Sequence, residues 1–140
     1  MTETETPGKP LIYPNRPEWD TYFLDVAKAV SRRGECLRSQ VGAVLVDKDC
    51  RIIATGYNGT KPGTQSCLDG ICPRAQNGVP SQAPYRDAGH CVAVHAELNA
   101  ITDAMHRRLP LHGLTIYLTK APCPACAAIL DGLMITPVFP

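Results

Sequence analysis

The sequence lacks any apolar run close to the roughly 20 residues that a membrane-spanning helix needs. Its first residues, Met1 to Asn15, are polar and contain no apolar core of a signal peptide. Strong charge of either sign is also missing, since the formal net charge is +1 at pH 7. A protein that binds a nucleic-acid polymer usually carries a strongly basic surface. We therefore expect a cytoplasmic protein whose partners include neither a membrane nor a nucleic-acid polymer.

Internal repeats are absent as well, and 140 residues fit a single domain. We expect residues 1–16 to be disordered or loosely attached and residues 17–140 to form the domain. Seven cysteines are many for this length, and an odd number without a secretion signal argues against a disulfide framework. Clustered cysteines in a reducing compartment are more often metal ligands. Burial as an apolar thiol is the alternative, and it suits Cys50 better than the other six.

Hydrophobic spacing predicts an alternation of helices and strands. The first part of the chain is expected to form a helix with Trp19, Phe23 and Ala27 on its inner side, followed by a β-hairpin; the ranges are 19–33 for the helix and 40–46 and 51–56 for the strands. The segment 64–90 shows little periodicity. So long a structureless stretch is unusual in a compact domain, and a bound metal is our candidate for what holds it.

The second part of the chain is expected to place one further helix before a strand and another after it. The inner side of the first of these helices is expected to carry Val94, Leu98, Ile101 and Met105. The ranges are helix 92–106, strand 114–119, a helix from Pro122 to about Leu130 and a last strand over 135–139. Because Pro137 cannot donate a ladder hydrogen bond, this last strand is expected at an edge of the sheet.

Two short motifs have the residue types and spacing of a metal centre. In Pro122-Cys123-Pro124-Ala125-Cys126, the two thiols are three residues apart at a helix start, so they share one face. A helix N-terminus also lowers the pKa of a thiol and favours the thiolate. His95 opens the other helix and adds a neutral third ligand. Three protein ligands leave a fourth position open, which is typical of a catalytic zinc site.

Glu97 gives this predicted site its chemistry. A glutamate two residues after a ligand histidine can reach a water on the zinc, whose pKa falls to about 7, without binding the metal. Glu97 is therefore predicted to take the proton of that water and pass it to a ring nitrogen and then to the leaving amine. The His-x-Glu and Pro-Cys-x-x-Cys pair is the signature of zinc deaminases. A closed structural zinc or a redox Cys-x-x-Cys would leave Glu97 without a role.

With these motifs, the chain resembles the cytidine deaminase superfamily, and within it the deoxycytidylate (dCMP) deaminase family. The residues that carry the resemblance are RPEWD at 16–20, CLR at 36–38, QVGA at 40–43, TGYNG at 55–59, HAELNA at 95–100 and the segment 116–126. The resemblance implies an α/β fold, a three-layer α/β/α sandwich around a mixed β-sheet. It also implies zinc-dependent hydrolysis of dCMP to dUMP and ammonia by a homo-oligomer.

The resemblance further implies which residues meet the nucleotide. It puts Asn58, in the loop after the second strand, near the sugar. Arg38, Ser39 and Lys61 are candidates for holding the phosphate. The alternative for the two basic residues is a solvated surface position, and Asn58 can occupy a turn for backbone reasons alone.

A second zinc site is implied in the same way. Relatives carry cysteines at the positions of Cys36, Cys67, Cys72 and Cys91, often with a histidine nearby, as His90 is here. A structural zinc bound by most of these residues would hold the segment 64–90 and contribute folding free energy directly. His90 could replace one of the cysteines.

Two other functions remain open on the sequence. One is deamination of another nucleotide, nucleoside or base, such as CMP, cytidine or a compound of the adenine or guanine type. The other is a non-catalytic, zinc-stabilised module that binds nucleotides, although such a module does not need Glu97.

Overall fold

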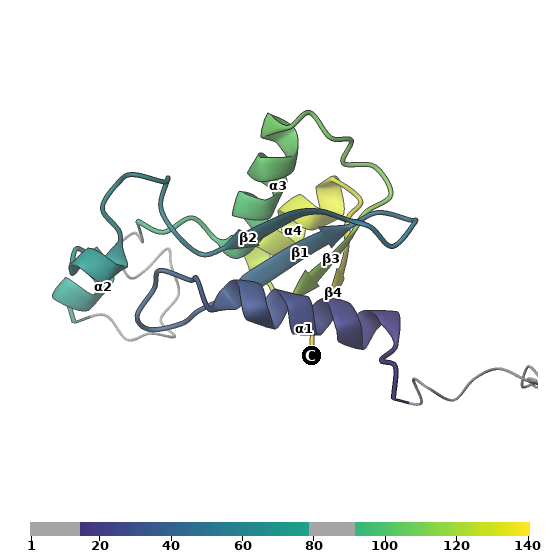
Figure 1. The fold of residues 1–140 in the computed structure, drawn as a ribbon. Helices are drawn as coiled ribbons and strands as arrows, with labels where there is room; N and C mark the ends of the chain where they lie inside the picture. The colour runs from purple at the N-terminus through teal and green to yellow at the C-terminus, as the bar shows by residue number, and fades with distance from the viewer. Residues whose placement is uncertain (1–14, 79–91) are drawn as a thin grey trace, which may run out of the picture.

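The computed structural model describes residues 15–78 and 92–140 (Figure 1). The expectation that residues 1–16 are loosely attached therefore lies, apart from its last two residues, outside the described part. The strands are β1 (Gly42–Val46), β2 (Ile52–Tyr57), β3 (Thr115–Leu118) and β4 (Thr136–Val138). They form a sheet in the order β2-β1-β3-β4. β1 runs antiparallel to both of its neighbours, whereas β4 runs parallel to β3, so the sheet is mixed as predicted.

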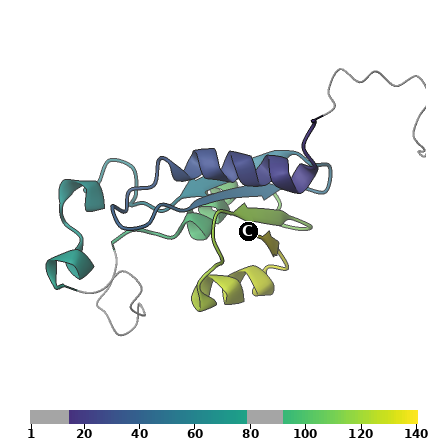
Figure 2. The ribbon, with the colours of Figure 1, turned by 90° about the horizontal axis from the view of Figure 1, so that it is seen from below.

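Helices cover both faces of this sheet. Helix α1 (Trp19–Ser31) lies on one face, and α3 (Ala96–His106) and α4 (Pro124–Gly132) lie on the other (Figures 1 and 2). Alternation along β1 explains the two layers, because successive side chains of a strand point to opposite faces. Val44 faces the core beneath α1, and Leu45 faces the core beneath α3 and α4. The predicted three-layer α/β/α sandwich is confirmed.

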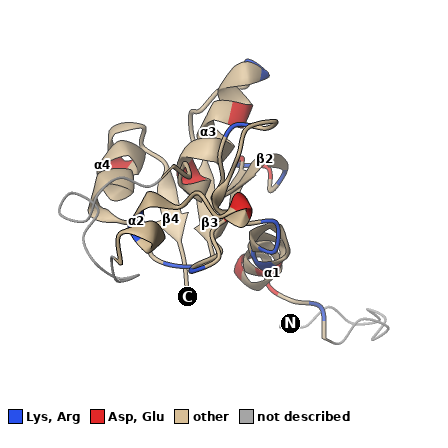
Figure 3. Ribbon diagram, turned by 90° about the vertical axis from the view of Figure 1, so that its left-hand side faces the viewer, with Lys and Arg blue, Asp and Glu red and all other residues tan. Residues whose placement is uncertain are grey.

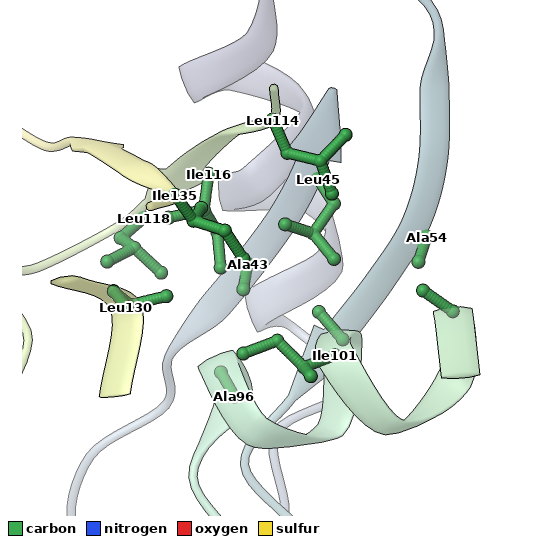
Figure 4. Packing of buried hydrophobic residues seen from close by; sticks show 12 residues of the cluster. Ala43, Leu45, Ala54, Ala96, Ile101, Leu114, Ile116, Leu118, Leu130 and Ile135 are labelled. Atoms are coloured by element: carbon green, nitrogen blue, oxygen red, sulfur yellow. The ribbon is translucent and has the colours of Figure 1, made fainter. Parts of the chain in front are cut away.

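Small residues bring α3 close to the sheet. Ala96 and Ala100 are fully buried on its inner side, in the core shown in Figure 4. Gly56 of β2 lies so near that a Cβ there would be 2.4 Å from the Ala100 nitrogen and 2.5 Å from the Ala96 oxygen. Gly56, the first glycine of the TGYNG string, is therefore needed for this close approach of helix and strand. The approach sets how the first turn of α3 lies against the sheet.

The start of α3 differs from the prediction. The helix begins at Ala96 rather than at residue 92, because Val94 pairs with Gly59 as an antiparallel bridge and His95 is extended (φ −66°, ψ 152°). The predicted inner face is also wrong at Val94 and Met105, which are 39% and 58% exposed. In their place, the alanines of α3 and Glu97 turn inward.

Smaller differences occur at the other helices. Helix α1 buries Phe23 and Ala27 as predicted, but Trp19 is 51% exposed and stacks on Phe23 at a centroid distance of 5.4 Å. Helix α4 begins at Pro124, with Cys123 as its N-cap, rather than at Pro122. The segment predicted to be irregular contains a 3₁₀ turn, η1 (Cys67–Asp69), and a short helix, α2 (Pro73–Gln76).

The edge position predicted for the last strand is confirmed, since β4 closes the strand order beside β3. Within residues 15–78 and 92–140, no helix has the length and hydrophobicity needed to cross a membrane.

Candidate active site

The ends of two helices bring three ligand side chains together. His95 stands immediately before α3, Cys123 caps α4, and Cys126 lies in the first turn of α4. Their ligand atoms all lie within 4.8 Å of one another. The His95 Nδ1 is 3.6 Å from the Cys123 Sγ and 3.4 Å from the Cys126 Sγ. The structure thus places the three predicted ligands in one cluster.

These distances fit a tetrahedral zinc ion. Bonds of about 2.3 Å to sulfur and about 2.0–2.1 Å to nitrogen, at the tetrahedral angle, give a nitrogen-to-sulfur edge of about 3.6 Å. In the described part of the chain no fourth side chain joins the group. Two thiolates balance the charge of the zinc ion, so the donor set fits zinc with one position left for water.

The protein groups around Cys126 disfavour its thiolate. Burial, the charge of Glu97 and the neighbouring Cys123 raise the pKa of the Cys126 thiol to about 12. This differs from the lowered thiol pKa expected at a helix start, because loss of solvent and two nearby negative groups outweigh the helix N-terminus. A divalent cation reverses this balance, since a thiol that coordinates zinc is deprotonated.

Glu97 lies beside the ligand group without belonging to it. Its side chain is buried, at 4% exposure, in the first turn of α3. It is near enough to Cys126 for its charge to raise the pKa of that thiol. A negative side chain in the first turn of a helix is favourable. The carboxylate is therefore held next to the ligands, where it can accept and release a proton.

Asn58 is buried and bridges the loop after β2 to the chain before β1. Its Oδ1 accepts a hydrogen bond from the Val41 backbone N–H at 2.9 Å, and its Nδ2 donates to the Ser39 oxygen at 2.7 Å. These bonds match the backbone role that the sequence left as the alternative. Contact of Asn58 with a sugar stays a prediction, for which the second Nδ2 hydrogen is the available donor.

The three phosphate candidates lie in different surroundings. Ser39 is half-buried, and its Oγ receives a hydrogen bond from the Lys120 Nζ at 3.0 Å. Arg38 lines a cavity together with cysteines, and its side chain hydrogen-bonds Cys72. Lys61 is exposed at the start of a turn closed by Thr64.

The described cysteines of the second predicted zinc site surround one cavity. Cys36, Cys67 and Cys72 line a space of about 90 Å³. The Ala75 backbone N–H, with further hydrogen bonds from the Cys67 thiol and Arg38, lowers the pKa of Cys72. Their sulfur atoms do not form as tight a set as the first ligand group. Cys91 and His90 lie outside the described residues, so this site stays a prediction.

Sequence reasoning gave no role to three residues that hold the site. Lys120 follows β3 and reaches Ser39, Asn99 lies inside the HAELNA string, and Glu35 precedes the CLR string. Asn99 and Glu35 bond to the loop after β2. A polar residue on the inner side of a helix start is the signal that could have singled out Asn99. For Lys120 the sequence contains no comparable signal, because its partner Ser39 is 81 positions away in the chain.

Comparison with known proteins agrees with this geometry. A family model described as the cytidine and deoxycytidylate deaminase zinc-binding region matches residues 17–139. The deoxycytidylate deaminase of Mycobacterium phage D29 is 47% identical over 118 residues, which are 83% of this chain and 88% of that protein. The deoxycytidylate deaminase of Schizosaccharomyces pombe is 36% identical over 130 residues, 91% of this chain but only 39% of the yeast protein.

A solved structure has the same fold. The dCMP deaminase from the cyanophage S-TIM5, in complex with dCMP and dUMP, superposes with a TM-score of 0.69 at 25% identity, over 89% of this chain and 82% of that one. Because the family model covers nearly all of the described residues and the ligand cluster fits zinc, the chain belongs to the cytidine and deoxycytidylate deaminase family of zinc-dependent hydrolases.

Proposed function

We propose that this protein hydrolyses dCMP to dUMP and ammonia. The observation that carries the proposal is the buried Glu97 carboxylate beside the cluster of His95, Cys123 and Cys126. A site that only binds zinc needs the ligands, whereas a hydrolytic site also needs a group that moves protons. The D29 and S-TIM5 proteins, named as dCMP deaminases, support dCMP as the substrate.

The zinc ligands and Glu97 have different roles in the proposed reaction. Zinc held by His95, Cys123 and Cys126 would supply Lewis-acid activation of the attacking water. Glu97 takes a proton from that water as its oxygen adds to C4 of the base, and gives the proton to the ring nitrogen N3. Glu97 then takes the remaining proton from the new C4 hydroxyl and gives it to the exocyclic amine as the bond from C4 to that nitrogen breaks, so that ammonia leaves and the C4 carbonyl of dUMP forms.

The variant Glu97→Gln tests the proposal, because it keeps the shape of the side chain and removes its ability to carry a proton. We expect retained zinc and fold with turnover lowered by about 10²–10⁴-fold. Ammonia release should be compared for dCMP, CMP, deoxycytidine and dCTP. Glu18→Gln, at the exposed start of α1, is the control. Undiminished turnover in Glu97→Gln would refute its role, and failure of the unaltered protein on dCMP would refute the substrate.

For the phosphate, we propose Ser39 and Lys120, with Arg38 and Lys61 as the further sequence candidates. Lys120 meets a neutral hydroxyl and, in the described part of the chain, forms no ion pair, so its charge is available to an anion. In the view of Figure 3, basic and acidic segments are interspersed, with both on α1, rather than gathered into one basic face, which suits a single phosphate better than a polymer.

Assembly and location belong to the same proposal. We expect a homo-oligomer, as the family resemblance implies, and the exposed Trp19 and Tyr22 on α1 offer apolar contact area. Sedimentation of the purified protein measures the number of subunits. The cytoplasmic location stays a prediction.

A further inference from the structure

The side-chain NH₂ group of Asn99 lies within hydrogen-bond distance of three backbone carbonyls, which share its two hydrogens. Its Nδ2 lies 2.7 Å from the Tyr57 oxygen, 3.2 Å from the Val94 oxygen and 3.3 Å from the Gly59 oxygen. Asn99 itself is tied to the metal-ligand segment, because its backbone N–H donates to the His95 oxygen at 3.0 Å. Three acceptors around one atom require a donor group, so the NH₂ end of the amide is the end that fits.

These carbonyls belong to two segments that are far apart in the chain. Tyr57 ends β2 and Gly59 lies in the loop after it, one on each side of Asn58, whereas Val94 directly precedes the ligand His95. Gly59 and Val94 also exchange backbone hydrogen bonds of 3.0 and 2.9 Å. The Asn99 amide closes this junction from the helix side, so it touches both segments at once.

We propose that Asn99 is a positioning residue that fixes the loop 57–60 relative to the zinc ligand His95. The inference rests on the proposed function and on the expectation that Asn58, in this loop, lies near the sugar of the nucleotide. Loss of the amide leaves three partly buried carbonyls with one donor fewer and lets the loop and the ligand segment move independently. Both nucleotide binding and the geometry of the metal centre should then change.

Glu35 provides a matched comparison, because it holds the same loop from the other side. Its Oε1 accepts from the Thr60 backbone N–H at 3.0 Å and from the Thr60 Oγ1 at 3.3 Å. Its own N–H donates to the Asn58 oxygen at 2.8 Å. None of these bonds reaches the segment before α3. Loss of the Glu35 carboxylate should therefore disturb the loop and leave the metal ligands in place.

The test compares Asn99→Ala with Glu35→Ala and with Thr102→Ala, an exposed position one turn further along α3. Each protein is loaded with cobalt for absorption spectra, which report the geometry of the thiolate ligands, and with zinc for KM and for dUMP binding by calorimetry. We expect Asn99→Ala to raise KM about tenfold, as for a lost buried hydrogen bond, and to shift the cobalt bands. Glu35→Ala should raise KM without shifting the bands, and Thr102→Ala should change neither.

Two results would overturn the inference. One is a folded Asn99→Ala protein with the KM and cobalt spectrum of the unaltered protein. The other is a lower melting temperature as its sole change, which is the result for a merely structural residue. Should Asn99→Ala not fold, Asn99→Ser keeps one donor and is expected to give intermediate shifts in both readouts. Absence of dCMP turnover in the unaltered protein would refute the proposed function instead, while the cobalt spectra still decide the role of Asn99.

Discussion

Lys120 is the residue expected to tell a nucleotide from a nucleoside. Its Nζ lies 3.0 Å from the Ser39 hydroxyl, and a charge-assisted contact with phosphate would be made from the same place. We expect Lys120→Ala to raise KM for dCMP about tenfold and to leave the weaker turnover of deoxycytidine unchanged. Steady-state kinetics with both substrates is the measurement.

Lys61→Ala is the companion variant, because Lys61 is the exposed cation that the sequence also offered for this role. An effect of less than twofold is expected there. A loss confined to dCMP in Lys61→Ala, with Lys120→Ala unaffected, would move the phosphate contact to Lys61. Equal losses on dCMP and deoxycytidine in Lys120→Ala would show that the lysine acts on the fold rather than on the phosphate.

Single residues differ in how far the sequence predicts them. His95, Cys123 and Cys126 could be grouped because metal ligands have few residue types and their spacing relative to helix starts is local. The bonds of Asn58 could not be predicted, since its partners Ser39 and Val41 lie across the hairpin. The orientation of the Arg38 side chain could not be predicted either, because it depends on a hydrogen bond to Cys72, which lies in a segment without periodicity.

At the scale of elements, a buried tyrosine joins α1 to the sheet. The Tyr117 hydroxyl of β3 donates to the Asp20 Oδ1 of α1 at 2.7 Å. Burial, this hydrogen bond and the charge of Asp20 raise the pKa of Tyr117 to about 12, from about 10 in the unfolded chain. The stabilisation is therefore complete below about pH 10 and is lost as the pH rises from there to about 12.

The variant Tyr117→Phe removes this contribution. We expect it to unfold more easily by about 1 kcal/mol at neutral pH, as for a typical hydrogen bond, and the difference from the unaltered protein should shrink above pH 10. Denaturant unfolding at a series of pH values measures it, with the exposed Tyr22→Phe on α1 as control. A difference that stays constant up to pH 12 would contradict the raised pKa.

Element boundaries were predicted well where local spacing decides them and poorly where a distant contact does. The compact β-branched run of β1 and the helical spacing of α1 are local, and both elements lie within the ranges predicted for them, 40–46 and 19–33. The first four residues of the predicted helix 92–106 lie outside the helix, because Val94 pairs with Gly59, which is 35 positions earlier in the chain. That bridge also brings His95 out of the helix to become its cap.

At the scale of the whole molecule, the layers could be predicted but the sheet order could not. The family resemblance implied three layers around a mixed sheet, whereas the order of the elements along the chain does not fix which strands become neighbours. That β3 lies beside β1, and not at the outside of the hairpin on β2, depends on which faces become buried together.

The number of zinc ions per chain depends on how the segment after β2 is held to the rest of the molecule. Cys36 reaches one cavity of about 90 Å³ from the chain before β1, and Cys67 and Cys72 reach it from the segment after β2. The resemblance implies Cys91 as a further ligand, with His90 able to replace one of the cysteines. A short 3₁₀ turn and a four-residue helix bury little apolar surface of their own, so a closed structural zinc would supply the missing folding free energy. We therefore expect two zinc ions per chain by metal analysis.

Substitutions in the two zinc sites should have different effects on metal content, melting temperature and turnover. Cys72→Ser is expected to leave one zinc ion and a lower melting temperature, with residual turnover, because the catalytic ligands lie on other elements. Cys126→Ser should also leave one zinc ion but abolish turnover. Cys50→Ser, whose thiol is half-buried in the β-hairpin turn, is the control and should keep both ions. A single zinc ion in the unaltered protein, with Cys72→Ser unchanged in metal content, would show that the cavity holds thiols packed without a metal.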